Sequence, residues 1–214
     1  MTDLESSSLL NQTWQRENVE LNIAFDSTVE AFARALELRE GEPLGHTRQV
    51  MEVTIGLANA IAVSIPEQLH IRRGALLHDI GQVAVSESIL KKAGPLTDAE
   101  WLIMKQHPLH AYDLLSPIVF LHRAIDIPYC HHERWDGTGY PQGLKKEQIP
   151  VSARIFAVVD VWDALTSDRP QRRAWPDEQA SHYLHEYAGK LFDPQVVMIF
   201  LDPEIKKRVT RPLV

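Results

Sequence analysis

The sequence has little cysteine and no long apolar run. Its 214 residues include one cysteine, Cys130, so the chain can form no internal disulfide bond. No stretch approaches the roughly 18 apolar residues of a membrane-spanning helix. The first ten residues, MTDLESSSLL, lack the basic and apolar regions of a signal peptide. These absences predict a cytoplasmic protein that has no membrane contact.

An excess of basic charge is also missing. The formal net charge is −7, whereas proteins that bind nucleic acid broadly usually carry a basic surface. Bulk nucleic acid is therefore not expected as a partner, and an anionic substrate would have to be held locally. With 44% hydrophobic residues, the chain can bury one substantial core.

Segments that resemble strands are absent as well, because apolar residues follow helical spacing almost everywhere. Val29, Phe32, Ala33 and Leu36 predict a helix that ends near Gly41. Residues 1–20 are polar and predict either a flexible segment or the end of a linker helix, with one domain over 21–214. Further helices are expected over residues 44–64, 64–81, 97–107, 117–132, 150–166, 177–189 and 194–201. The predicted fold is all-α, a helical bundle with long functional loops over 82–96 and 133–149.

Local signals set several of these boundaries. Ser64 and Pro66 favour a helix start, and the LLHDI segment then places His78 and Asp79 near the C-terminal end of that helix, with Gly81 as the stop. The TDAE segment at 97–100 has the spacing of a capping box. Pro108 is expected to disturb the helix that reaches His107.

Histidines gather with acids at several points of the chain. Any one of them is more often a packing or surface residue than a metal ligand. Neighbouring residues on a helix point about 100° apart, so the adjacent pairs are poorly placed to serve one ion in the same way. Two or more metal ions explain them better. The residues are His46, the His78 and Asp79 pair, His107, and the His131 and His132 pair.

Asp160 lies within the apolar run ARIFAVVDVWDAL. An unpaired carboxylate would be costly to bury there, so it needs a counter-charge. A metal ion would supply one. A salt bridge with Arg154 is the alternative.

Taken together, these residues resemble the HD-GYP family, the bacterial cyclic di-GMP phosphodiesterases of the HD superfamily. The resemblance runs from about Ala35 to Leu201 and rests on the strings ALELRE, LLHDIG, ILKKAGPLT, HHERWDGTGYP, IPVSARIFAVVDVWDALTSDRP and FDP. It implies an all-α bundle with a centre of two or three divalent metal ions. The implied ligands are Glu42, His46, His78, Asp79, His107, His131, His132 and Asp160.

The resemblance also implies roles for individual residues. Asp79 would bridge two ions and position a hydroxide for attack on the phosphodiester. Glu42, four residues before His46, matches the extra acid of members that hold three metals, with a solvated side chain as the alternative. The mixed nitrogen and oxygen ligands suit iron or manganese, and the absence of thiolates argues against structural zinc. The family favours iron.

The segment HHERWDGTGYP is expected to approach a nucleotide closely. Its turn would place Gly137, Tyr140 and Pro141 beside the substrate, although a simple turn in which Asp136 bonds nearby backbone is also open. Glu133 is interpreted as a partner that orients a ligating histidine. The tryptophans Trp101, Trp162 and Trp175 are interpreted as core or interface residues.

Two departures from the family pattern concern substrate phosphate. Gln82 stands where the family usually has lysine, and Gln171 stands where it has tyrosine. Glutamine offers neutral hydrogen bonds where lysine offers a charge. Arg169 and Arg172 match phosphate-contacting positions, with a solvated basic patch as the alternative.

The function implied is hydrolysis of cyclic di-GMP to pGpG, with onward hydrolysis to GMP as an open second step. A metal-containing receptor with little turnover that signals through a partner is one alternative, favoured by Gln82. An HD enzyme acting on another nucleotide is a second, disfavoured by the DGTGYP loop. Leu21 and Phe25 precede the first apolar stripe, so an N-terminal helix could pair two copies of the chain or pack on its own core. An upstream sensory or receiver module is an expected partner.

Overall fold

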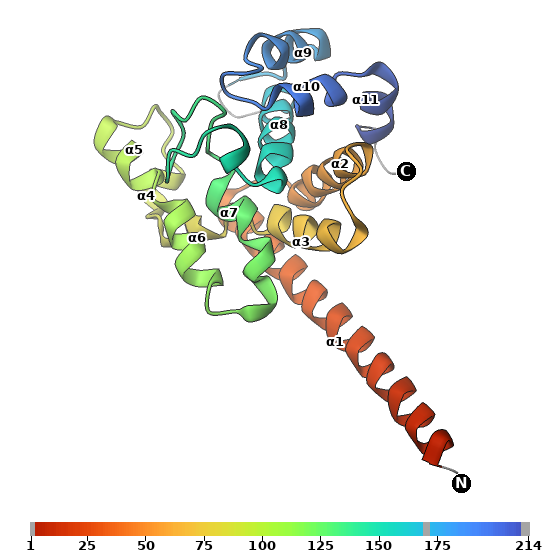
Figure 1. Ribbon diagram of the computed structural model, residues 1–214. Coiled ribbons are helices and arrows are strands. Elements are labelled where there is room, and N and C mark those ends of the chain that lie inside the picture. The colour runs from red at the N-terminus through yellow and green to blue at the C-terminus, as the bar shows by residue number, and fades with distance from the viewer. Residues whose placement is uncertain (1–2, 169–171, 211–214) are drawn as a thin grey trace.

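The structure is a computed structural model that describes residues 3–168 and 172–210, with side chains described from residue 14 onward. Helices make up nearly all of its regular structure (Figure 1). The elements are α1 (Asp3–Glu40), α2 (His46–Ala60), α3 (Ile65–Leu76), η1 (Ile80–Ala84), α4 (Glu87–Leu90), α5 (Asp98–Met104), α6 (His107–Leu115), η2 (Val119–Ala124), α7 (Asp126–Cys130), η3 (Lys146–Gln148), α8 (Val151–Thr166), α9 (Asp177–Glu186), α10 (Pro194–Phe200) and α11 (Pro203–Val209).

The all-α prediction is confirmed. Over the described residues, extended pairing is limited to an isolated bridge between Ala188 and Phe192. None of the helices in these ranges combines the length and the apolar character needed to cross a bilayer.

Helix α8 lies at the centre of the core. It is apolar around most of its circumference, and a helix of this kind is stable when other elements cover it on several sides. Phe156 of α8 is fully buried, as are Leu57 of α2 and Phe200 of α10. The core therefore joins segments that are distant in the sequence around the helix that carries Asp160.

Helix α1 has a packed half and a projecting half. Its N-terminal part points away from the bundle in Figure 1, whereas Val29, Ala33 and Leu36 are buried. Phe32 is 54% exposed, so its place in the predicted apolar stripe is wrong. The buried stripe continues through Glu37, which leaves Phe32 at its edge. The helix also spans residues 3–20, in agreement with the linker-helix alternative, and the domain boundary at residue 21 stays a prediction.

Several predicted boundaries need correction. Helix α2 begins at His46 and ends at Ala60, and α3 ends at Leu76. Gly81 does not stop α3, because it belongs to the separate 3-10 helix η1. Ser64 is the N-cap of α3, as expected, although its side chain makes no capping hydrogen bond. The helix ends just before His78 and Asp79, which confirms their place near a helix C-terminus.

The predicted capping box is confirmed. The Thr97 hydroxyl accepts a hydrogen bond from the backbone N–H of Glu100, and the Glu100 carboxylate accepts one from the backbone N–H of Thr97. The prediction that Pro108 disturbs a helix reaching His107 is wrong, because α5 ends at Met104 and Pro108 lies in the first turn of the next helix, α6. Proline is tolerated there because that turn needs no backbone donor.

Other segments are more divided than predicted. The helix expected over 117–132 consists of η2 and α7, and the expected loops contain η1, α4 and η3. Helix α11 was not predicted. Its start is stabilised by Asp202, whose side chain accepts hydrogen bonds from the backbone N–H groups of Glu204 and Ile205.

Gly81 gives a test of the packing that positions the site. A Cβ atom at Gly81 would lie 1.8 Å from the His107 carbonyl oxygen and 2.7 Å from the Ala111 backbone nitrogen. Backbone atoms cannot move aside locally, so Gly81→Ala should lower the free energy of unfolding by about 1–3 kcal/mol. Urea denaturation measures this change. Gly94→Ala is the matched control, since a Cβ there meets nothing within 4 Å, and equal stability of the two variants would contradict the packing argument.

Candidate metal centre

Side chains from three parts of the bundle converge at one point. Asp79 follows the end of α3, His107 is the first residue of α6, and His131 and His132 follow α7. One ligand atom from each of these four residues lies within 4.8 Å of those of the others. Helix ends therefore bring together residues that are up to 53 positions apart in the chain.

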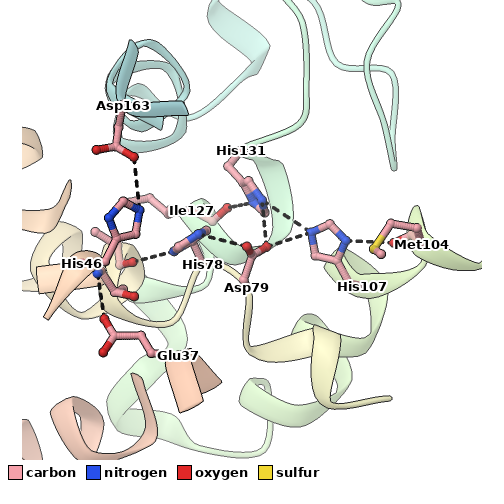
Figure 2. Close-up of polar contacts among 11 residues, drawn as sticks. Glu37, His46, His78, Asp79, Met104, His107, Ile127, His131 and Asp163 are labelled. Atoms are coloured by element: carbon pink, nitrogen blue, oxygen red, sulfur yellow. Dashed lines mark hydrogen bonds and ion pairs between the residues drawn. The ribbon is translucent and has the colours of Figure 1, made fainter. Parts of the chain in front are cut away.

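Backbone carbonyl groups fix the orientation of three imidazole rings. The Nδ1 atom of His78 lies 2.9 Å from the Ala75 carbonyl oxygen, and the Nδ1 atom of His107 lies 2.9 Å from that of Met104. In His131 the corresponding distance, to Ile127, is 3.0 Å (Figure 2). A carbonyl oxygen can only accept, so each Nδ1 donates its proton. The Nε2 atoms are then turned toward the centre of the cluster.

The three Nε2 atoms meet the carboxylate of Asp79. His78 Nε2 lies 3.1 Å from Asp79 Oδ2, whereas His107 Nε2 and His131 Nε2 lie 3.3 and 3.6 Å from Oδ1 (Figure 2). The two oxygens of Asp79 therefore face different imidazoles. This arrangement allows one carboxylate to serve two ions.

The spacing of His107 and His131 fits a bound cation. Their Nε2 atoms are 3.4 Å apart, and both rings already use Nδ1 as the donor. In the neutral rings the two Nε2 lone pairs would face each other without a proton between them. Imidazole nitrogens held by a carbonyl on the opposite side of the ring, together with a carboxylate oxygen, are the usual surroundings of a divalent transition metal.

Burial sets the protonation of the cluster. Burial lowers the pKa of His107 to about 4 and that of His132 well below its usual value. Burial alone would raise the pKa of Asp79, but the neighbouring imidazoles, His78 first, hold it well below its usual range. Burial likewise acts to lower the pKa of His78, and the charge of Asp79 outweighs it and raises that pKa to about 10. Asp79 is therefore ionised and His107 and His132 are neutral, as metal binding requires, whereas His78 is protonated and an ion bound at its Nε2 would displace that proton.

The remaining predicted ligands surround this cluster. Glu42, in the loop before α2, and Asp160, on α8, line the cavity that contains Asp79. Burial raises the pKa of Asp160. The salt bridge considered for Asp160 is not formed, because Arg154 pairs with Asp193 at 2.6 Å. Both acids stay predicted ligands.

His46 lies at one side of the cluster. Its Nε2 atom is 3.1 Å from Oδ2 of Asp163, one turn beyond Asp160 on α8 (Figure 2). It is not among the four residues whose ligand atoms converge within 4.8 Å. Its role as a ligand stays a prediction.

Sequence reasoning missed two acids that position His46. Asp163 pairs with the ring, and Glu37 is only 2% exposed. The Glu37 carboxylate accepts hydrogen bonds of 2.9 and 2.8 Å from the backbone N–H groups of Gly45 and Thr47. The signal for Glu37 was its place on the same face of α1 as Ala33, where a buried carboxylate needs donors.

The loop after the adjacent histidines is held by a buried acid. Glu133, 4% exposed, accepts hydrogen bonds of 2.7 and 3.0 Å from the backbone N–H groups of Gln142 and Leu144. The hypothesis that Glu133 orients a histidine is therefore wrong. A Cβ atom at Gly139 would lie 2.3 Å from the Arg134 backbone nitrogen, so only glycine fits this tight loop.

The first half of the same loop is a local turn. Asp136 accepts hydrogen bonds from the backbone N–H and the hydroxyl of Thr138, as the simple-turn alternative predicted. Gly137 has a φ angle of +82°, a conformation that glycine adopts readily. Tyr140 and Pro141 follow, joined by a cis peptide bond. The turn and the approach to the cluster coexist in one loop.

The cluster lies on the wall of a cavity of about 1030 Å³. Tyr140 lines this cavity and stacks on His132, with 4.8 Å between ring centroids and 26° between planes. Gln82 lines it as well. Trp101 is 46% exposed and also lies on the wall, so it is not a core residue, and the alternative that it lies at an interface stays a prediction. This volume lies at the upper end of the range found for small-molecule sites.

The two arginines predicted to contact phosphate have different outcomes. Arg169 lies outside the described residues. Arg172 donates hydrogen bonds to the carbonyl oxygens of Ala164 and Leu165, near the end of α8, and it is not among the residues that line the cavity. In this structure Arg172 therefore stabilises a helix C-terminus.

Comparison with known proteins agrees with this site. The HD domain family matches residues 30–196, which is most of the chain. The chain belongs to the HD domain family. Within this family, the similar proteins are HD-GYP phosphodiesterases, so the resemblance to the HD-GYP group is confirmed.

The relatives of this HD domain include two kinds of phosphodiesterase. The cyclic di-GMP phosphodiesterase response regulator RpfG of Xanthomonas campestris is 42% identical over 172 residues, covering 79% of this chain and 46% of the relative. The 3'3'-cGAMP-specific phosphodiesterase 2 of Vibrio cholerae is 36% identical over 192 residues, covering 87% of this chain and 37% of the relative. The chain thus spans less than half the length of these relatives.

A solved structure confirms the fold of the HD domain. Bd1817, described as a HDG"Y"P protein from Bdellovibrio bacteriovorus, has a TM-score of 0.60 and 22% identity to this chain. The match covers 73% of this chain and 50% of that one. At this identity the likeness concerns the fold alone.

Asp79 gives a direct test of metal binding. Asp79→Asn keeps the shape of the side chain but removes the negative charge that faces His78 on one oxygen and His107 and His131 on the other. The purified variant should retain less than about a tenth of the wild-type metal content, because outright loss of a ligand charge weakens a site at least as much as loss of a supporting contact. Elemental analysis by mass spectrometry measures this.

The matched control is Asp113→Asn, an exposed acid on the helix that carries His107. Its metal content should equal that of the wild type. A metal-replete Asp79→Asn protein would contradict the central role of Asp79.

Proposed function

We propose that this chain is a metal-dependent phosphodiesterase that hydrolyses cyclic di-GMP. The observation that carries the proposal is the convergence of the imidazole Nε2 atoms of His78, His107 and His131 on the two oxygens of Asp79. The names of the relatives support the reaction and the substrate class. Bound divalent metal ions would supply the activation of water near neutral pH and the neutralisation of phosphate charge.

The residues of the chain divide the remaining work. His78, Asp79, His107, His131 and His132 would hold the ions, with Glu42, His46 and Asp160 as the further predicted ligands. Iron is the ion we expect first, with manganese as the alternative, and two or three ions would be bound. The donor set contains no thiolate, which agrees with this choice.

The cavity wall would hold the nucleotide. Tyr140 is fixed by its stacking on His132, so its ring offers a rigid surface beside the predicted ligands. Gly139 lets the loop pack against the backbone of Glu133 and Arg134, and the Glu133 carboxylate holds the loop in place. Hydrolysis would break one bond between phosphorus and a 3′ oxygen, which leaves with a proton from water. The first product would be pGpG, and a second hydrolysis would give GMP.

Two other functions have specific support. Relatives named as 3'3'-cGAMP-specific phosphodiesterases favour a mixed cyclic dinucleotide as substrate. Gln82, which replaces a lysine on the cavity wall, favours a receptor that binds the nucleotide with weak turnover. We place cyclic di-GMP hydrolysis first because the predicted metal ligands are retained.

Two observations bear on the partners of the protein: apolar side chains are exposed on α1, and the relatives are more than twice as long as the region they share with this chain. Trp14 and Leu21 are 64% and 63% exposed, whereas Phe25 packs against Phe120. The projecting part of α1 would therefore pair two copies of the chain or connect the domain to a sensory or receiver module. A cytoplasmic location is consistent with a nucleotide substrate.

Turnover of the two cyclic dinucleotides tests the proposed function. The wild-type protein loaded anaerobically with iron or manganese should convert cyclic di-GMP to pGpG, with a kcat/KM higher than that for 3'3'-cGAMP. Chromatographic separation of the nucleotides measures both rates. Tight binding of cyclic di-GMP without turnover with either metal would favour the receptor function instead, and faster cleavage of 3'3'-cGAMP would reassign the substrate.

Gln82 gives a test of phosphate recognition. Gln82→Lys adds a cation on the cavity wall, and a charge-assisted contact stabilises a bound anion by about 1.5–3 kcal/mol. The KM should fall about tenfold or more while kcat stays constant, because the lysine would stabilise bound substrate and transition state equally. Steady-state kinetics at matched metal content measures this. Unchanged KM and kcat would show that position 82 does not contact substrate.

A further inference from the structure

The cavity around the metal centre is rich in acids and poor in cations. Among the described residues that line it, the permanently basic side chains are Lys105 and Arg134. The acidic ones are Glu40, Glu42, Asp79, Asp98, Glu133 and Asp160. Such a wall repels an anionic ligand unless positive charge is placed at specific points.

A cyclic dinucleotide sharpens this problem, because it carries two phosphodiester groups with one negative charge each. Metal ions at Asp79 could neutralise the group that is cleaved. The second group lies across the ring of the nucleotide and needs a different counter-charge. Gln82 cannot supply that charge, and the guanidinium of Arg172 is engaged with the end of α8.

Lys105 is placed to supply it. It follows α5 directly, lies on the cavity wall, and stands two residues before the predicted ligand His107. Its ammonium group lies 5.5 Å from the centroid of the Tyr140 ring, and Tyr140 stacks on His132. An ammonium group at this distance from an aromatic face is weakly attracted to it, which holds the group near the loop without neutralising it.

The availability of this charge separates Lys105 from neighbouring lysines. Lys91 and Lys92 form ion pairs with Glu87 and Glu100, both at short distance. Within the described part of the chain, the Lys105 ammonium lies over the ring of Tyr140 and forms no ion pair. Its charge is therefore free to meet an incoming anion.

We infer that Lys105 is a substrate-binding residue that contacts the phosphodiester not being cleaved, and so takes on the part of phosphate recognition that Gln82 cannot perform. The inference rests on the proposed function, since it requires a cyclic dinucleotide in the cavity. It makes Lys105 a determinant of affinity, with no part in activating water.

The test compares Lys105→Gln with the wild type. The KM for cyclic di-GMP, and the dissociation constant measured by calorimetry, should both rise about tenfold, because a charge-assisted contact is lost. The kcat should stay within about twofold, as expected for an interaction made equally before and during the reaction. Added salt should weaken binding to the wild type more steeply than binding to the variant.

Three further variants make the result specific. Lys105→Arg keeps the charge and should retain most of the affinity. Lys91→Gln makes the same change of charge directly after α4, outside the cavity, and should match the wild type. Arg134→Gln tests the other cation of the wall, and a loss of affinity confined to that variant would overturn the assignment to Lys105.

Metal content distinguishes contact with substrate from an effect on His107. All the lysine variants should contain as much metal as the wild type, whereas a merely structural role for Lys105 would lower the metal content and kcat together. Equal KM, equal affinity and equal salt dependence in Lys105→Gln and the wild type would also overturn the inference. A wild-type protein that neither binds nor cleaves any cyclic dinucleotide would remove the proposed function first.

Discussion

The buried carboxylate of Asp79 is the interaction on which the site depends. A negative charge is costly to place inside a protein, and it persists there only if other groups compensate for the lost water. Here the compensation comes from imidazoles that three different segments direct toward it. The ends of α3, α6 and α7 must therefore meet at one point, and the packing of the bundle around α8 serves that requirement.

Backbone geometry at helix ends does much of this positioning. The last carbonyl groups of a helix have no partner within the helix. Beside the candidate metal centre, the carbonyl of Ala75 in α3 and that of Met104 at the end of α5 accept from His78 and His107. Each ring then presents Nε2 to the interior. The same groups that would otherwise need water thus determine which nitrogen of each ring is available.

Much of this arrangement could be predicted from the sequence. Helical spacing, the TDAE capping box and the position of His78 and Asp79 after a helix all follow from local rules. Most candidate ligands were found because histidines stand next to acids or to each other, and because Asp160 lies within an apolar run. Here local chemistry and the global fold agree.

The rest depends on tertiary contacts that no local pattern reports. Glu133 carries the same charge as a surface glutamate, and only its burial against the backbone of Gln142 and Leu144 shows that it holds the loop. Phe32 fits the helical spacing of α1 but lies beyond the edge of the surface that the helix covers. Pro108 could end one helix or begin another, and the packing of α6 against η1 decides between them.

Helix α1 also has a mechanical consequence. Two residues near its C-terminal end hold opposite sides of the centre: Glu37 accepts from the backbone before and within α2, and Arg39 donates to the carbonyl oxygens of Gln82 and Val85. The helix has 38 residues and is about 57 Å long, and its far end stands clear of the bundle in Figure 1. Through these hydrogen bonds, the C-terminal end of α1 holds both the segment that leads into His46 and the segment that follows Asp79. A small tilt of α1, imposed at its N-terminal end, would therefore change the distance between these two segments, which flank the candidate metal centre.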